Sequence, residues 1–248
     1  MEEKDLIFKK SFKCPICDTV FKNLTVRQGK ARPDSTDIDL KVNYKNIEVL
    51  KYDVIMCPVC GYAALERYFE RVSAYQRKCI IDEISVNFQA VPDKDDYTYD
   101  EVIVRYRQAI NVSRVKNAHN SELGFLCLKF GWIYRAYAAS LNPETEAKKI
   151  KELSLREQGF LNNAFLYLEK ARATESSPIC GMDESTLDCL LAGLAVKLGK
   201  YVDAKKYVGF VIQNRSATKR AKDKVIDIKE IVNEKLAELE GEEDNDEN

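Results

Sequence analysis

Two C-x-x-C pairs constrain this chain more than any other feature of its sequence. Cys14 and Cys17 form the first pair, Cys57 and Cys60 form the second, and 39 residues separate them. Two intervening residues bring both sulfurs of a pair to one side of a tight turn. Four thiolates at tetrahedral corners complete the coordination sphere of zinc and leave no position for water. The spacing therefore predicts one structural Zn²⁺ ion in a ribbon-like β module.

The residues after each pair favour tight turns. Gly61 follows the second pair and permits left-handed backbone, and Asp18 holds that place after the first pair. The other interpretation is four free or redox-active thiols, which usually lie at a helix start in a thioredoxin-like context. Nothing in the flanking sequence indicates such a context. Because structural zinc contributes on the order of 10 kcal/mol to folding, we expect metal removal to unfold the amino-terminal half.

The other four cysteines lack this spacing. Cys79, Cys127 and Cys189 fall among apolar helix positions, where a core role is expected. Cys180 resembles half of a metal-binding turn, but no second cysteine stands three positions away. A metal role is therefore predicted for the two pairs alone.

The sequence offers little for catalysis. Its single histidine, His119, lies at a predicted helix end, where a surface or capping role is expected. One histidine excludes a histidine-rich zinc hydrolase and disfavours nucleophile–histidine catalysis. The glycines Gly193 and Gly199 are spaced by five residues, whereas a phosphate-binding loop needs four. The sequence predicts a protein that is not an enzyme.

Hydrophobic periodicity divides the chain and predicts an α+β fold. It changes from two to about 3.6 residues after Tyr62. We predict a zinc-ribbon-like β module over residues 1–70, a helix and hinge over 71–97, an all-α tetratricopeptide-like domain over 98–240, and a disordered acidic tail over 241–248. Capping patterns at Ser73 and at Thr98 with Glu101 mark two helix starts.

The helical half carries a repeat pattern. One copy has the small and aromatic residues of a tetratricopeptide helix pair at Leu191, Ala192, Ala195, Gly199, Tyr201, Ala204, Tyr207 and Val211. A second copy is matched by Cys127, Phe130, Gly131, Tyr134, Ala164, Leu168 and Ala171, with an insertion over 142–155. Generic helix-hairpin packing without repeat ancestry is the alternative.

Stacked helix pairs form a concave face from their first helices. If the repeat alignment holds, a partner-binding surface would consist of Phe125, Trp132, Arg135 and Lys197. A tryptophan beside an arginine has the composition of a binding hot spot. The alternative is that Trp132 is a core residue. The preferred interpretation is a non-catalytic adaptor for a protein or peptide.

A basic loop after the first pair gives a second functional hypothesis. Its cations are Lys22, Arg27, Lys30 and Arg32. Beside a zinc ribbon they could contact nucleic-acid phosphates. Asp37 and Asp39 follow closely, so local salt bridges to Arg27 or Arg32 are the simpler explanation, and a divalent cation on the two aspartates is a further one.

The chain has the sequence of a cytoplasmic protein. Its net charge is −1, and its first residues are charged with no apolar segment after them. The most apolar stretch, Leu123–Leu141, is interrupted by Lys129 and Arg135, so it should not cross a bilayer. In the cytoplasm, cysteines are expected as thiols or metal ligands rather than disulfides.

Several motifs together resemble one bacterial family. They are CPIC at 14–17, DIDL at 37–40 and CPVCGYA at 57–63. Over roughly residues 10–215 the chain is similar to the family called domain of unknown function 2225. The resemblance implies a bacterial cytosolic protein that joins a four-cysteine site to tetratricopeptide-like helices. It implies no activity.

Overall fold

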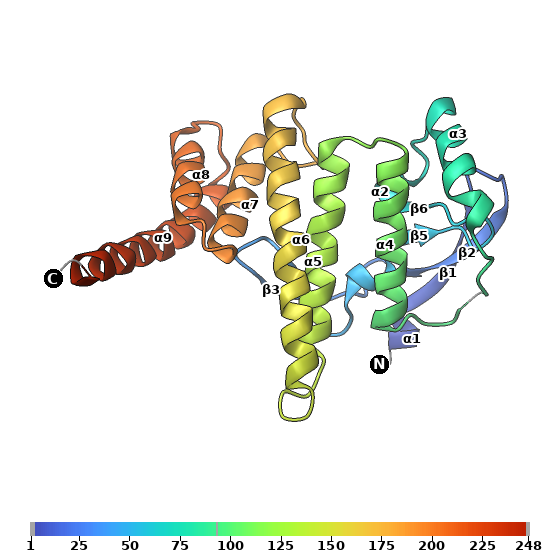
Figure 1. Ribbon diagram of the computed structural model, residues 1–248, viewed down its shortest axis with the longest axis horizontal. Helices are drawn as coiled ribbons and strands as arrows, with labels where there is room; N and C mark the ends of the chain where they lie inside the picture. The colour runs from blue at the N-terminus through green and yellow to red at the C-terminus, as the bar shows by residue number, and fades with distance from the viewer. Residues whose placement is uncertain (1–2, 93, 247–248) are drawn as a thin grey trace.

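The computed structural model describes residues 3–92 and 94–246, with side chains described to residue 239. Small antiparallel strand pairs fill the amino-terminal part, and an array of long helices follows (Figure 1). This arrangement confirms the predicted α+β class.

Three separate two-stranded sheets make up the β structure. The pairs are β1 (Ile7–Lys13) with β2 (Val20–Val26), β3 (Pro33–Thr36) with β4 (Val42–Tyr44), and β5 (Val54–Met56) with β6 (Ala63–Leu65). Short helical segments connect or flank them: α1 (Glu3–Leu6), η1 (Val49–Tyr52) and α2 (Glu66–Phe69). Every residue of β5 and β6 is buried, because helix α4 (Tyr99–Val115) covers this hairpin.

The two predicted capping boxes are present. Ser73 accepts a hydrogen bond from the backbone of Gln76 at the start of α3 (Ala74–Glu83), and Thr98 does the same with Glu101 at the start of α4. After α3, the short segment η2 (Ser85–Asn87) leads into the residues before α4. The predicted start of the helical domain at residue 98 coincides with this cap.

In the described part of the chain, five helices follow α4. They are α5 (Asn120–Ala139), α6 (Ala147–Thr174), α7 (Glu184–Lys197), α8 (Tyr201–Gln213) and α9 (Lys219–Asp246). Helices α5 and α6 form one antiparallel pair, α7 and α8 form another, and α9 projects away from them (Figure 1). The insertion predicted over 142–155 is largely helical, since α6 already begins at Ala147. Among the described residues, no helix is both long and apolar enough to span a membrane.

Small residues set the spacing of the helix pairs, as the repeat pattern requires. A Cβ atom added to Gly131 on α5 would lie 2.8 Å from the side chain of Leu161 on α6. Gly199 has φ +70° in the turn between α7 and α8. These contacts show two close-packed helix hairpins, α5–α6 and α7–α8. Their relation to tetratricopeptide repeats stays a prediction.

The predicted tail boundary at residue 241 falls inside α9. Helical backbone continues to Asp246, beyond the point where α9 leaves the body of the molecule (Figure 1). Residues 241–246 of the expected tail are helical, and residues 247–248 lie outside the described part of the chain.

The loop between β3 and β4 reaches across to the helices. Its backbone lies against Gly193 on α7, where an added Cβ would be 2.2 Å from the carbonyl oxygen of Ile38. This oxygen belongs to the backbone and cannot rotate away as a side chain could. Close packing of the amino-terminal module on the helices therefore requires glycine at position 193.

We predict that Gly193→Ala destabilises the protein by about 1–3 kcal/mol, because the loop must move away from α7. Gly209→Ala on α8 is the matched control, since an added Cβ there meets nothing within 4 Å. Loss of a mid-helix glycine should stabilise this control by about 0.5–1 kcal/mol. Urea unfolding of both variants measures the difference. Equal effects at the two positions would contradict the tight loop contact.

Candidate metal centre

The first cysteine pair lies in the turn that joins β1 to β2. The backbone N–H of Cys14 donates to the carbonyl of Thr19 at 2.9 Å, and the N–H of Asp18 donates to the carbonyl of Cys14 at 3.0 Å. Asp18 has φ +60°, the left-handed conformation predicted for it. This turn directs the sulfurs of Cys14 and Cys17 away from the hairpin and toward the second pair.

The second pair occupies the equivalent turn between β5 and β6. The backbone N–H of Cys57 donates to the carbonyl of Tyr62 at 2.8 Å, and the N–H of Gly61 donates to the carbonyl of Cys57 at 3.1 Å. Gly61 has φ +72°, and a Cβ added there would lie 2.3 Å from the ring of Phe88. Both backbone angle and packing therefore require glycine after Cys60.

The two turns bring all four sulfurs together. Cys14 Sγ lies 3.6 Å from Cys60 Sγ, and Cys17 Sγ lies 3.7 Å from Cys57 Sγ. All four sulfurs lie within 4.8 Å of one another. A Zn–S bond of about 2.3 Å places tetrahedral sulfurs about 3.8 Å apart. The cluster therefore fits one four-coordinate metal ion held by thiolates.

Burial of the cluster makes its charge depend on a cation. Cys14, Cys57 and Cys60 are buried, and Cys17 is half-buried. Hydrogen bonding with Cys57 raises the pKa of Cys14 to about 12, and hydrogen bonding with Cys14 and Cys57 raises the pKa of Cys60 as well. Hydrogen bonds from Cys14 and Cys60 lower the pKa of Cys57 to about 2. Burial and the mutual contacts of these thiols oppose the ionisation of Cys14 and Cys60, and a bound metal ion would favour their thiolate forms.

Helices α3 and α4 fix the backbone of both turns. Arg77 on α3 donates to the carbonyl of Ile16 at 2.9 Å and to the carboxylate of Asp18 at 2.8 Å. Gln108 on α4 donates to the carbonyl of Gly61 at 2.8 Å. Ile80 and other apolar residues complete a small core around the cysteines. Helix α3, the helix of the predicted 71–97 segment, therefore packs on the two cysteine turns.

The helical site predicted for a partner is engaged by the chain itself. Trp132 is 8% exposed, and its Nε1 donates to Asp39 at 2.9 Å. Arg135 contacts Asp39 at 2.5 Å, Asp37 at 2.6 Å and Glu157 at 2.7 Å. The expectation that Trp132 and Arg135 form an open surface is therefore corrected: the β3–β4 loop covers them.

The other two residues of that predicted surface remain accessible. Lys197 is exposed on α7, yet it lies close enough to Asp39 to lower the pKa of that carboxyl. Phe125 is half-buried, with the ammonium of Lys129 4.8 Å from its ring centre. Trp132, Arg135 and Lys197 thus lie around the carboxylate of Asp39. The sequence pattern did not predict this carboxylate as their common neighbour.

Asp37 and Asp39 pair with Arg135, not with Arg27 or Arg32 as the simpler sequence explanation held. Arg135 supplies the positive charge that pairs with both carboxylates, so a divalent cation is not needed to explain them. The four basic residues Lys22, Arg27, Lys30 and Arg32 are exposed. Arg27 lies over the ring of Phe8 at 5.4 Å.

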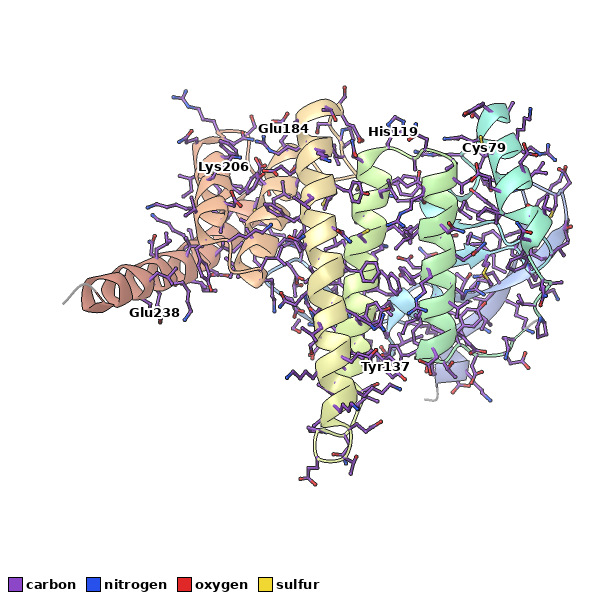
Figure 2. All side chains as sticks on the ribbon, in the orientation of Figure 1. Cys79, His119, Tyr137, Glu184, Lys206 and Glu238 are labelled. Atoms are coloured by element: carbon purple, nitrogen blue, oxygen red, sulfur yellow. The ribbon has the colours of Figure 1, made fainter. Side chains whose placement is uncertain are left out.

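The remaining singled-out residues have local roles. His119 is exposed at the N-cap of α5, without a capping hydrogen bond from its side chain (Figure 2). Cys127 and Cys189 are buried as expected, and Cys79 is half-buried on α3. Cys180 has φ +52°, and its thiol donates to the carbonyl of Ser121 at 3.2 Å.

The fold and the cysteine cluster define a class: a two-hairpin, four-cysteine module joined to a helical array. Residues 7–232 match the family described as "Uncharacterized protein conserved in bacteria (DUF2225)". The chain belongs to this family. No curated protein and no solved structure matches it.

We predict that Cys57→Ser abolishes metal binding, whereas Cys79→Ser on α3 leaves one metal ion per chain. Loss of a structural metal costs on the order of 10 kcal/mol of folding free energy in small modules, so the two hairpins should lose amide protection. Elemental mass spectrometry gives the metal content, and hydrogen exchange gives the protection. Metal retention by Cys57→Ser, or unchanged protection after metal loss, would contradict the site.

A second prediction concerns Asp39, which is fully buried. Burial alone would raise its pKa, but hydrogen bonds from Arg135 and Trp132 outweigh burial and lower the pKa below 3.8. A carboxyl with a lowered folded-state pKa stabilises the fold above its unfolded pKa, and this stabilisation is lost as pH falls through the folded value.

Asp39→Asn should therefore cost about 1.5–3 kcal/mol at pH 7, the usual contribution of hydrogen bonds to a charged group. The difference from the unchanged protein should shrink below about pH 4. Asp34→Asn is the control, because Asp34 is exposed and pairs only with exposed Lys45. Denaturant unfolding across pH measures both variants. A pH-independent loss in Asp39→Asn would show that its charge is unimportant.

Proposed function

We propose that this protein is a non-catalytic adaptor, stabilised by one zinc ion, that binds an extended acidic segment of a protein partner in its helical groove. The cytoplasm, where thiols stay reduced, is the expected compartment. Zinc is favoured over other metals that bind four thiolates because it has no redox chemistry and accepts this ligand set as a closed structural site.

The observation that carries the proposal is the seating of the chain's own loop on α5 and α7. Asp39 is held by Trp132 and Arg135 from α5, while the Ile38 carbonyl lies against Gly193 on α7. The carboxylate of Asp39 is recognised by the charge of Arg135, and the loop backbone closely approaches Gly193. This is how a helical groove would hold an extended acidic peptide. The loop shows which ligand chemistry the face accepts.

Next to the seated loop, an open section of the helical surface lies between α7 and α9. A cavity of about 790 Å³ lies there, bounded on one side by Thr36 and Val42 of the β3–β4 hairpin. Thr186 and Cys189 line it from α7. This section is therefore next to the seated loop and shares helix α7 with it.

The charges of the open section favour an acidic occupant. Lys219, Arg220 and Lys224 line the cavity from α9, against Asp223 and Asp227. Lys219 and Arg220 are exposed. The excess of cations matches the acidic character of the loop in the neighbouring section. An extended acidic segment in the open section would contact both α9 and the edge of the loop.

The test places a photoreactive residue at Thr186, inside the cavity, or at Lys206 on α8, outside the cavity lining (Figure 2). We expect the Thr186 probe to cross-link a specific partner peptide, identified by mass spectrometry as an acidic segment. The double substitution Lys219→Glu and Arg220→Glu should lower its yield, because reversed charges repel an acidic ligand.

Equal capture from positions 186 and 206, or a yield that does not respond to the charge reversal, would contradict groove binding. Added salt should lower the yield as well, because it screens the attraction between the exposed cations Lys219 and Arg220 and an acidic ligand. A peptide without acidic residues would exclude the proposed ligand chemistry while leaving an adaptor role for the groove.

A second candidate is a nucleic-acid-associated factor that uses the ribbon and the loop from Lys22 to Arg32. One observation favours it: among the described residues, none of the four exposed cations of this loop forms an ion pair. Their charges are therefore available to phosphates. Co-purification of nucleic acid that is released by salt, and lost on substituting Arg27 and Arg32, would favour this alternative over the adaptor.

A further inference from the structure

Arg105 is a buried cation with no carboxylate partner in the described part of the chain. The residue is 8% exposed and lies on α4, facing the strands. Both of its hydrogen bonds leave from Nη2, one to Asn23 and one at 3.2 Å to the carbonyl of Val54. Its Nε is buried without any partner. Neutral oxygens thus satisfy only part of a guanidinium that carries a full charge.

The acidic side chain one turn earlier on α4 already has other partners. Glu101, one turn earlier on α4, pairs with Lys94 at 2.8 Å and accepts hydrogen bonds from Thr98. The ring of Tyr97 lies 4.2 Å from the Arg105 guanidinium and offers a cation–π contact. A buried charge without an opposite charge is strongly unfavourable, so an anionic partner would be stabilising.

Arg105 also lines a cavity. The cavity has a volume of about 330 Å³ and lies between β2, the turn after Cys57 and the segment before α4. Its walls include Met56, Pro58 and Val91, which are apolar, and its rim includes the exposed ammonium of Lys22. The volume suits a small molecule rather than a folded partner.

We propose that this cavity binds a small organic anion, with Arg105 and Lys22 on its phosphate or carboxylate group and the apolar walls around its body. The arrangement is that of a small-molecule site, in which a few polar groups fix orientation and apolar surface covers the rest. In the described part of the chain, Nη1 forms neither of the Arg105 hydrogen bonds, so its N–H groups are the donors left for such an oxyanion. The site lies on the amino-terminal module and is separate from the helical groove.

The experiment titrates the metal-loaded, full-length protein with phenyl phosphate and with phenylacetate by calorimetry. The neutral 2-phenylethanol controls for apolar binding alone. We expect one saturable site for at least one of the two anions and none for the alcohol. Comparing the two anions distinguishes a phosphate site from a carboxylate site.

Arg105→Gln should weaken binding by at least about tenfold, whereas Arg105→Lys, which keeps the charge, should retain more of the affinity. Arg156→Gln on α6 is the control, because Arg156 is exposed, pairs with Glu152 on its own helix and does not line this cavity. Lys22→Gln changes an exposed residue and should weaken binding by a smaller factor, so it tests the site even if Arg105→Gln does not fold. Failure of both anions to bind, or full affinity in both Lys22→Gln and Arg105→Gln, would overturn the proposal.

Discussion

The structure depends on the convergence of four cysteine sulfurs from two turns that are far apart in the sequence. Each hairpin is too small to bury a core of its own, and their shared interior consists of the sulfurs and a ring of apolar side chains. Burial and mutual contacts raise the pKa values of Cys14 and Cys60, so ionisation of these thiols is unfavourable without an opposite charge. A cation bound by the thiolates would offset part of their charge and would tie the two hairpins together.

The convergence of the two cysteine pairs explains how the long interval between them is used. The interval leaves the cluster along β2, crosses to the helices as the β3–β4 hairpin, and returns through η1 to β5. At its far point, Asp39 is buried against Arg135 and Trp132. The segment between the two cysteine pairs is therefore fixed at both ends by the cysteines and in its middle by the buried ion pair of Asp39 and Arg135. The two halves of the molecule are joined through this segment as well as through α4.

Local sequence chemistry predicted what depends on short spacing. The cysteine cluster, the left-handed Asp18 and Gly61, and the capping boxes at Ser73 and Thr98 all require only a few neighbouring residues. The α+β class followed from the change in periodicity. Each of these features is decided by backbone geometry that the sequence specifies directly.

What covers a helix face was not predictable in the same way. The repeat pattern placed Trp132, Arg135 and Lys197 near one another, and the structure does so, but the pattern does not say which segment lies opposite. The covering residue, Asp39, is more than ninety positions away from Arg135 in the chain. Arg105 gave no signal either, because nothing near it in the sequence shows that, among the described residues, no carboxylate pairs with it.

X-ray absorption spectroscopy of the purified protein at the metal edge tests the central claim most directly. The account predicts a first shell of four sulfur atoms at about 2.3 Å from a zinc ion, with no oxygen or nitrogen neighbour. A shell that contains light-atom ligands, fewer than four sulfurs, or no bound metal at all would contradict the convergence of the two cysteine pairs on one ion.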